Sequence, residues 1–323
     1  MKNRICDMLG IEKPVIGAAM TWVSDARWVA AISNAGGLGV LGPNCGDTVP
    51  TDSPVETGER LRREIRKTRE LTDKPFAVNY LLPTKGVEAT YTFARPIYKV
   101  LKEEKVRIVL TSSEVVNEEE VAQLKKDGFI VIHRDISPTI DSLKKAEACG
   151  VDALIATGYE AGGHMSAYRI SLMSLFPQAR EAIRIPLLAA GGICTTAGAK
   201  AVAAMGAEGV YVGSRFLVTL ESPVSTNCKQ ALIAAKAEEL VEFRAVIGHM
   251  RTTPNKVGLL CEKMSREGAD IMEITGTYSG GFRTGMLLGD LENGIVSASE
   301  SVGMINEIKT CGEVVEELAA AFL

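Results

Sequence analysis

Short runs of apolar residues recur along this chain, and each is followed by a longer amphipathic stretch. Most of the runs are apolar throughout instead of alternating with polar residues, which is typical of parallel strands buried on both faces. The expected strands are at residues 14–17, 38–41, 76–80, 106–111, 129–133, 153–156, 186–190 and 209–212. The helices expected between them are at residues 25–34, 57–71, 91–104, 118–126, 137–149, 175–183 and 196–205.

Regular alternation of strand and helix predicts an α/β fold in which helices wrap a parallel sheet. Eight such units indicate a closed (β/α)₈ TIM barrel, and 323 residues are enough for one barrel with an insertion. The alternative is an open, doubly wound sheet. That fold favours a G-x-G-x-x-G turn after its first strand, and the sequence has none there.

The barrel pattern ends near Arg215, and the chain then becomes more helical. The later elements that we expect are helices at residues 228–241, 256–267 and 307–322 and a glycine-rich loop at 276–285. We therefore predict one barrel made of residues 1–221 and 290–323. Residues 222–289 are predicted to be a helical insertion that packs as a lid over the barrel mouth.

Charge and composition exclude several classes of function. The net charge is −4, whereas nucleic-acid-binding domains usually carry a basic excess. The basic cluster within residues 60–69 is interleaved with glutamates and is interpreted as the solvated face of a helix. No apolar run reaches the roughly 18 residues of a membrane span, and the N-terminus does not resemble a signal peptide. The seven scattered cysteines, without a C-x-x-C pair, favour free thiols in the cytoplasm over disulfides or a zinc site.

In a barrel of this kind, functional groups lie in the loops that follow the strands. Gly191 and Gly192 follow the seventh predicted strand, and Gly213 and Ser214 follow the eighth. Such loops commonly bind phosphate, because glycine lets backbone N–H groups approach the oxygens and a helix N-terminus follows. Either loop alone is better explained as a turn from strand to helix. The two together, one unit apart, favour a phosphate site.

A second candidate is the loop G-Y-E-A-G-G-H at residues 158–164, which follows the sixth predicted strand. Small neighbours leave His164 accessible, and an ordinary histidine pKa of about 6.5 suits proton transfer near neutral pH. The alternative is a solvated loop histidine, which is the interpretation that we adopt for His133 and His249. Asn79 could bind a ligand or cap a turn, and Met20 could contact a planar ring or simply pack.

Taken together, these segments resemble the 2-nitropropane dioxygenase superfamily of FMN-dependent barrels. That group contains nitronate monooxygenases, a flavin-containing enoyl-acyl-carrier-protein reductase and a related NADH:quinone reductase. The most specific part of the resemblance is E-A-G-G-H followed by the two phosphate loops. The matching segments are residues 13–20, 34–39, 71–79, 160–164, 189–193 and 212–216, with 248–255 and 289–294 similar to the reductases in particular.

The resemblance implies FMN as the cofactor and His164 as the catalytic histidine. His164 would be a base or a positioning group for a nitronate, or a donor beside an enoyl thioester. The residues implied to border the flavin or hold its phosphate are Ala18, Ala19, Met20, Asn79, Arg134, Gly162, Gly163, Gly191, Gly192, Gly213 and Ser214. The resemblance also implies a homodimer that acts on a small molecule, with no nucleic-acid or membrane partner.

The chain departs from its relatives around this site. Relatives read Q-G-G-M where residues 17–20 read G-A-A-M, and A-G-Q where residues 298–300 read A-S-E. Residues 111–114 read T-S-S-E instead of an initial Thr-Gly, and residues 165–166 read M-S instead of an apolar residue and a glycine. These changes surround the flavin or the substrate. They leave the expectation of FMN in place and leave the substrate open.

Several functions fit these residues. NAD(P)H-dependent reduction of an enoyl thioester or enone is favoured, with hydride passing from nicotinamide to FMN and then to the β-carbon. A donor near His164 would stabilise the enolate as its charge develops. A nitronate monooxygenase, which uses oxygen and no nicotinamide, would use His164 equally well. A quinone reductase is a further alternative, and the retained His164 speaks weakly against a binding protein without catalysis.

Overall fold

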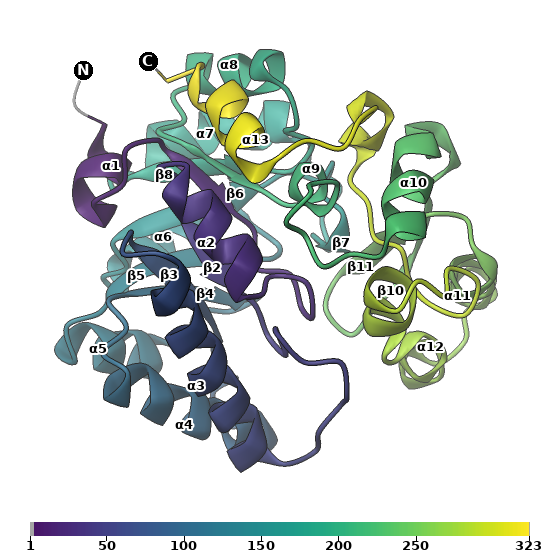
Figure 1. Ribbon diagram of the computed structural model, residues 1–323, viewed down its shortest axis with the longest axis horizontal. Helices are drawn as coiled ribbons and strands as arrows, with labels where there is room; N and C mark the ends of the chain where they lie inside the picture. Colours follow the sequence, from purple (N-terminus) through teal and green to yellow (C-terminus); the bar gives the residue numbers. More distant parts are fainter. Residues whose placement is uncertain (1–2, 323) are drawn as a thin grey trace.

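The computed structural model describes residues 3–322, and its centre is a barrel of parallel strands (Figure 1). The strands are β1 (Val15–Gly17), β2 (Gly39–Leu41), β3 (Phe76–Leu81), β4 (Ile108–Ser113), β5 (Ile130–Asp135), β6 (Ala153–Thr157), β8 (Leu187–Ala190) and β9 (Val210–Val212). They pair in the order β1-β9-β8-β6-β5-β4-β3-β2. A parallel bridge between Ile16 and Leu38 joins the two ends of the sheet, so the barrel is nearly closed. The eight predicted strands and the (β/α)₈ fold are confirmed.

Helices form the outer layer around these strands (Figure 1). They are α2 (Ala26–Asn34), α3 (Pro54–Leu71), α4 (Glu88–Glu103), α5 (Glu118–Lys126), α6 (Ile140–Ala148), α7 (Leu172–Ala182), α8 (Thr196–Ala204) and α13 (Cys311–Ala319). α3 begins before the predicted residue 57, because Ser53 accepts a hydrogen bond from the N–H of Glu56. Pro54 then occupies the first helical position, where no N–H donor is needed.

Two apolar layers account for the burial of the strands. Side chains such as Ile16, Leu110 and Ile155 fill the barrel interior, and their neighbours along each strand pack outward against the helices. The short helix α1 (Arg4–Leu9) adds Ile5 and Leu9 to the interior layer. α1 therefore packs against the end of the barrel at which the strands begin, and the opposite end is left for the loops that carry function.

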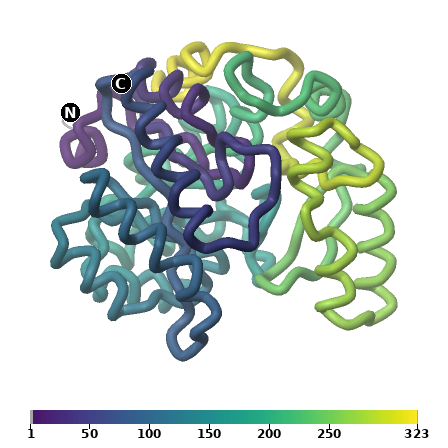
Figure 2. Tube along the Cα trace, turned by 60° about the horizontal axis from the view of Figure 1, so that its bottom comes forward, coloured from purple at the N-terminus to yellow at the C-terminus, as the bar shows by residue number. Residues whose placement is uncertain are grey.

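The insertion lies to one side of the barrel in both ribbon and tube views (Figures 1 and 2). Its elements are α10 (Thr226–Ala234), η1 (Ala237–Glu239), β10 (Val241–Arg244), β11 (His249–Thr252), α11 (Lys256–Arg266), α12 (Ile271–Tyr278) and the π-helical turn η2 (Arg283–Leu287). β10 and β11 form a three-stranded antiparallel sheet with β7 (Gly163–Met165), which belongs to the histidine loop of the barrel. Two shorter helices complete the chain, α9 (Ser214–Leu217) and η3 (Glu300–Met304).

The expectation of a purely helical insertion is wrong in one respect. The predicted helix at 228–241 ends early, and its last residue begins strand β10. Val241 and Phe243 are buried while Glu242 and Arg244 are partly exposed, which is the period-two alternation of a strand. The helical reading failed because this alternation covers only four residues.

Two other boundaries also differ from the prediction. Part of the expected loop at 276–285 is helical, since α12 extends to Tyr278 and η2 begins at Arg283. The helix expected at 307–322 is α13, which begins at Cys311 because Thr310 and Glu313 form a capping box.

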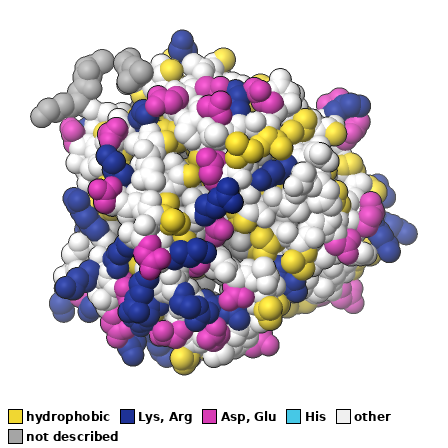
Figure 3. All heavy atoms as spheres, in the orientation of Figure 1, with side chains coloured by type: hydrophobic (Ala, Val, Ile, Leu, Met, Phe, Trp, Pro, Cys, Tyr) yellow, Lys and Arg dark blue, Asp and Glu magenta, His cyan; other side chains and the backbone are white. Residues whose placement is uncertain are grey.

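Basic residues of α3 form ion pairs within the fold. Arg62, Arg66 and Arg69 surround Glu104, which follows α4, at nitrogen–oxygen distances of 3.0, 2.8 and 3.2 Å. Figure 3 shows basic and acidic side chains interleaved over the part of the surface where α3 and α4 lie in Figure 1. Between residues 3 and 322, no helix is both long and apolar enough to cross a membrane.

Candidate active site

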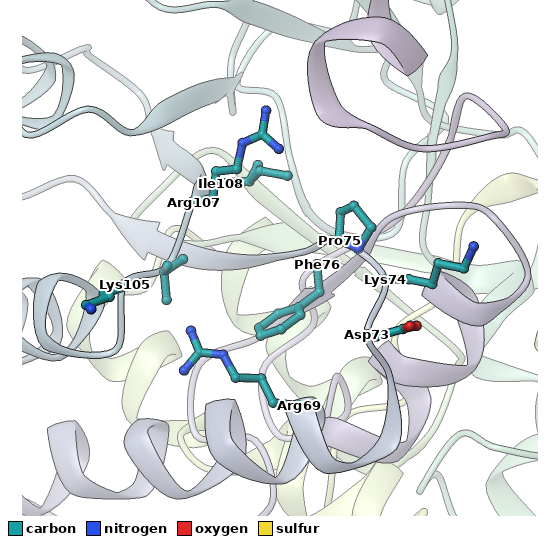
Figure 4. Close-up of a pocket in the computed structure, with 9 residues that line it drawn as sticks. Arg69, Asp73, Lys74, Pro75, Phe76, Lys105, Arg107 and Ile108 are labelled. Atoms are coloured by element: carbon teal, nitrogen blue, oxygen red, sulfur yellow. The ribbon is translucent and has the colours of Figure 1, made fainter.

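Two hollows lie at opposite ends of the barrel. The smaller has a volume of about 220 Å³ and lies where β3 and β4 begin (Figure 4). Two of the charged side chains that line it are already paired, Arg69 with Glu104 and Lys74 with Glu12. Functional groups of a TIM barrel lie at the other end, where the strands finish. The candidate active site is therefore the larger cavity there.

The larger cavity has a volume of about 540 Å³, within the range of small-molecule and cofactor sites. The loops after the barrel strands form most of its wall. Every residue that the sequence singled out for the site lies in this wall: Ala18, Ala19, Met20, Asn79, Arg134, Gly162, Gly163, His164, Gly191, Gly192, Gly213 and Ser214. The fold thus brings together residues that are up to 196 positions apart in the chain (from 18 to 214).

The two glycine loops present hydrogen-bond donors to the cavity. Gly192 has φ +70°, and the N–H groups of Gly192 and Gly213 donate to no acceptor among residues 3–322. Ser214 Oγ accepts a hydrogen bond of 2.9 Å from the N–H of Ser299, which leaves its own proton free to donate. Free donors on neighbouring loops after β8 and β9 form a cradle that suits phosphate oxygens.

Gly162 is required by close packing. A Cβ atom at this position would lie 2.3 Å from the carbonyl carbon of Ala298, a distance that no side chain can tolerate. The segment around Ala298 therefore lies directly against the histidine loop, and Ser297 and Ser299 from it also line the cavity. Of the two departures from A-G-Q, Ser299 thus falls in the cavity wall, whereas Glu300 does not line the cavity.

Asn79 and Arg134 place polar groups on the barrel side of the cavity. The Asn79 amide donates to the carbonyl oxygen of Leu110 at 3.0 Å, and its own oxygen accepts from no described residue. Arg134 donates to Thr157 Oγ1 and to the carbonyl oxygen of His164, both at 3.3 Å. Within residues 3–322, no carboxylate oxygen lies within 4.0 Å of its guanidinium. Arg134 is therefore a cation available to an anionic or electron-rich ligand.

His164 lies on β7, opposite Met250 of β11, and its ring faces Phe282 with 6.2 Å between the ring centroids. Burial lowers the pKa of His164 to about 4, and the positive charge of Arg134 acts in the same direction. At neutral pH the imidazole is therefore uncharged. It can donate one hydrogen bond and accept another, which suits a proton donor or a hydrogen-bonding group toward a developing oxyanion.

The other two histidines lie elsewhere. His133 is buried in strand β5, outside the cavity lining, with its Nδ1 2.9 Å from Thr111 Oγ1, so its interpretation as a solvated loop histidine is wrong. His249 lies on β11, and its Nδ1 is 3.5 Å from the carbonyl oxygen of Ser166. Neither residue lines the cavity, so His164 is the histidine that can meet a ligand there.

Sequence reasoning missed an apolar part of the cavity wall. It is lined by Ile247, Phe282 and Met286 from residues 222–289, together with Leu217. The glycine-rich run at 276–285 was the one signal in this region, and it marks a flexible backbone without identifying a side chain. Arg134 is the one formally charged side chain among the described lining residues, so this wall favours an apolar substrate portion.

Known proteins similar to this chain match it over most of its length. The family model described as "Nitronate monooxygenase" matches residues 2–321. A probable nitronate monooxygenase of Staphylococcus aureus (strain JH9) is 29% identical, with 84% of this chain and 82% of that protein covered. The (3aS,4S,5R,7aS)-5-hydroxy-7a-methyl-1-oxo-octahydro-1H-indene-4-carboxyl-CoA dehydrogenase of Rhodococcus jostii (strain RHA1) is 28% identical, over 99% of this chain and 95% of that protein.

The similarity to solved structures also covers nearly the whole chain. FabK from Thermotoga maritima superposes with a TM-score of 0.85 at 30% identity, over 100% of this chain and 96% of that chain. Nitroalkane oxidase from Streptomyces ansochromogenes superposes with a TM-score of 0.78 at 27% identity, over 97% and 96% of the two chains. The similarity therefore extends over the barrel and the insertion alike.

Proposed function

Because this chain belongs to the nitronate monooxygenase family of oxidoreductases, we propose that it is an FMN-dependent enzyme that reduces an activated C=C bond with NAD(P)H. The substrate class is an enoyl thioester or a related enone. The observation that carries this proposal is the apolar wall of Ile247, Phe282 and Met286, which lines the same cavity as His164 and Arg134.

The residues of the cavity fit FMN. The free N–H groups of Gly192 and Gly213 and the hydroxyl of Ser214 would hold the phosphate. Met20, Asn79, Gly162 and Gly163 would lie along the ring, with Ala18 and Ala19 beside them, and the Arg134 guanidinium would face its electron-rich edge. When bound there, FMN would supply the transfer of hydride from nicotinamide to the β-carbon of the substrate.

The protein's own contribution is to orient the substrate, exclude water and manage charge. The neutral imidazole of His164 would donate a hydrogen bond to the substrate carbonyl, where negative charge develops as the β-carbon is reduced. The wall formed by Ile247, Phe282 and Met286 would cover the apolar part of the substrate. We propose that residues 222–289 serve as the lid of a barrel formed by 1–221 and 290–323.

Nitronate oxidation is the second candidate, and it is favoured by the family model and by the Staphylococcus relative. The favoured reading rests instead on the superposition with FabK, an enoyl-acyl-carrier-protein reductase, and on the apolar lid wall. A small nitroalkane has little apolar surface to cover with such a wall.

Turnover assays separate the two candidates. We expect the protein, reconstituted with FMN, to consume NADH or NADPH when a short enoyl thioester or cyclic enone is added. We also expect it to consume little oxygen with an alkyl nitronate in the absence of nicotinamide. Oxygen uptake with the nitronate, together with no nicotinamide oxidation with any enone, would replace the proposed function with nitronate oxidation.

The pH dependence of turnover is a further prediction. Because the pKa of His164 is about 4, its imidazole stays neutral as the pH falls from 8 to 6, and protonation begins only near pH 5. The turnover number should therefore show no loss centred on about pH 6.5, where an ordinary histidine titrates. A pH profile of kcat at constant ionic strength checks this, with His164→Gln as the control that lacks the titrating group. A limb near pH 6.5 that disappears in His164→Gln would contradict the neutral-donor role.

A further inference from the structure

Arg251 is a buried charge that the proposed function does not use. It lies on β11 with 1% of its surface exposed, and it does not line the cavity. Its Nη1 donates to the backbone carbonyl oxygens of Tyr159 and Ala161, each at 2.8 Å. These two carbonyl groups belong to the loop that leads directly into Gly162, Gly163 and His164.

The remaining donors of Arg251 meet two carboxylates. Nε donates to Glu242 of β10 at 3.0 Å, and Nη2 donates to the same carboxylate. Nη2 also lies 2.8 Å from Glu300 Oε1, which belongs to the segment after the insertion. The guanidinium thus makes four hydrogen bonds, and Nη2 adds an ion pair with Glu300. One side chain ties together β10, the segment at Glu300 and the histidine loop.

These contacts matter because the site is buried. A guanidinium removed from water loses its hydration, so its donors need well-placed partners to compensate. Burial also favours the neutral form of Glu242, but hydrogen bonds from Tyr159 and Arg251 outweigh it and lower the pKa of that carboxyl group. The Tyr159 ring packs beneath the guanidinium, with 4.9 Å from Cζ to the ring centroid. The network therefore has one well-defined geometry.

Backbone pairing between β11 and β7 also connects Arg251 to the candidate active site. β11 pairs with β7 so that Arg251 is opposite Gly163 and Met250 is opposite His164. Ser297 Oγ donates to the carbonyl oxygen of Arg251 at 3.3 Å, which joins the cavity wall to the same strand. Any change in the position of the Arg251 side chain would thus move the loop that presents His164.

We propose that Arg251 is a positioning residue that sets the orientation of His164 by fixing the carbonyl groups of Tyr159 and Ala161. Glu242 and Glu300 hold the guanidinium in place through its Nε and Nη2 atoms. The carboxylate of Glu300, where relatives have an amide, gives the network a second ion pair. This inference rests on the proposed role of His164 in the reaction.

The variant that tests it is Arg251→Lys. Lysine keeps the charge but presents its donors from a single nitrogen, so it cannot bond both carbonyl groups and both carboxylates. We expect kcat to fall by about tenfold or more while KM and the FMN dissociation constant change by less than about threefold. The matched control is Arg169→Gln. Arg169 lies 3.6 Å from Glu242 and over the Tyr159 ring, but it bonds no carbonyl group of the loop.

Two measurements test the positioning role of Arg251 separately from the proposed function. Hydrogen exchange over residues 158–165 of the FMN-loaded protein should become faster in Arg251→Lys and stay unchanged in Arg169→Gln. In a double-mutant cycle, Arg251→Lys should cost little further turnover once His164 is replaced by alanine. The cycle is run with an enone and NAD(P)H and also with a nitronate and oxygen.

Each outcome has a clear meaning. Unchanged exchange, or equal and additive losses of kcat with and without His164, would overturn the positioning role. Faster exchange and non-additive losses with the nitronate alone would support the positioning role while rejecting enone reduction. If Arg251→Lys does not fold, Glu242→Gln provides the same test, because it weakens the same side of the network with little change of shape. Hydrogen exchange and the double-mutant cycle, measured on Glu242→Gln, then test the positioning role by the same criteria.

Discussion

Replacing His164 with alanine is expected to lower turnover by about 10² or more, the usual scale for an acid–base group. The neutral imidazole lies in the cavity beside Phe282, where it can both donate and accept a hydrogen bond near neutral pH. FMN should stay bound, because the predicted phosphate and ring contacts come from other loops. Steady-state kcat, measured together with the flavin content of the purified variant, checks this result.

The matched control is His249→Ala. His249 lies one position from the partner of His164 on the paired strand, and it does not line the cavity. It should keep kcat within about threefold of the parent protein. If His164→Ala keeps full turnover with FMN bound, His164 has no place in the mechanism. An equal loss in both variants would indicate a general disturbance of the sheet formed by β7 and β11.

Replacing Gly213 with aspartate is expected to lower FMN affinity by about 10². The backbone accepts a side chain there, since φ is −108° and a Cβ atom would lie 3.5 Å from Ala18 Cβ and 3.7 Å from Met20 Sδ. The added carboxylate would face the phosphate. Two like charges about 5 Å apart at an effective dielectric of about 20 repel by about 3 kcal/mol, which is about 10² in affinity. Titration of apoprotein with FMN, followed by the quenching of flavin fluorescence, measures the loss.

Gly276→Asp is the control for this substitution. Gly276 lies in α12, and a Cβ atom there would meet no atom within 4 Å. This variant should bind FMN as tightly as the parent protein. If Gly213→Asp also bound FMN normally, the phosphate would have to lie away from the loop after β9, and the proposed orientation of the cofactor would be wrong.

The barrel was predictable because its strands are mostly apolar runs, as in β6 and β8, separated by helices with clear caps such as Asn117. Such signals are local, so they can be read without knowing what lies nearby. Part of the site followed from the barrel itself, because loops after successive strands converge at one end, and the resemblance supplied residues such as Arg134. Gly192, Gly213 and His164 were identifiable for that reason.

The part of the cavity wall that comes from residues 222–289 could not be predicted in the same way. Phe282 and Met286 line the cavity because this segment returns to the barrel, and the glycine-rich sequence at 276–285 gives no sign of that. Strand β10 is four residues long, and only its first residue, Val241, lies within the helix that the sequence predicted. Its pairing with β11, and through β11 with β7, depends on contacts between distant parts of the chain.

The contact between Arg251 and Glu300 also could not be predicted from the sequence. The resemblance marked the segment around Arg251 as similar to the reductases, and it marked Glu300 as a departure from an amide. Neither observation indicated that the two side chains meet, 2.8 Å apart, behind the histidine loop. A long-range ion pair of this kind has no sequence period, so it becomes visible only when the fold is known.

The central claim is that the cavity at the barrel mouth holds FMN for NAD(P)H-dependent reduction. Oxygen-free rapid mixing of the FMN-loaded protein with NADH, and separately with NADPH, tests it most directly through the flavin absorbance at about 450 nm. We predict rapid loss of this absorbance with at least one of the two nucleotides, and its recovery when an enoyl thioester or enone is added. An absorbance that stays unchanged with both nucleotides, in protein that retains its FMN, would contradict the claim.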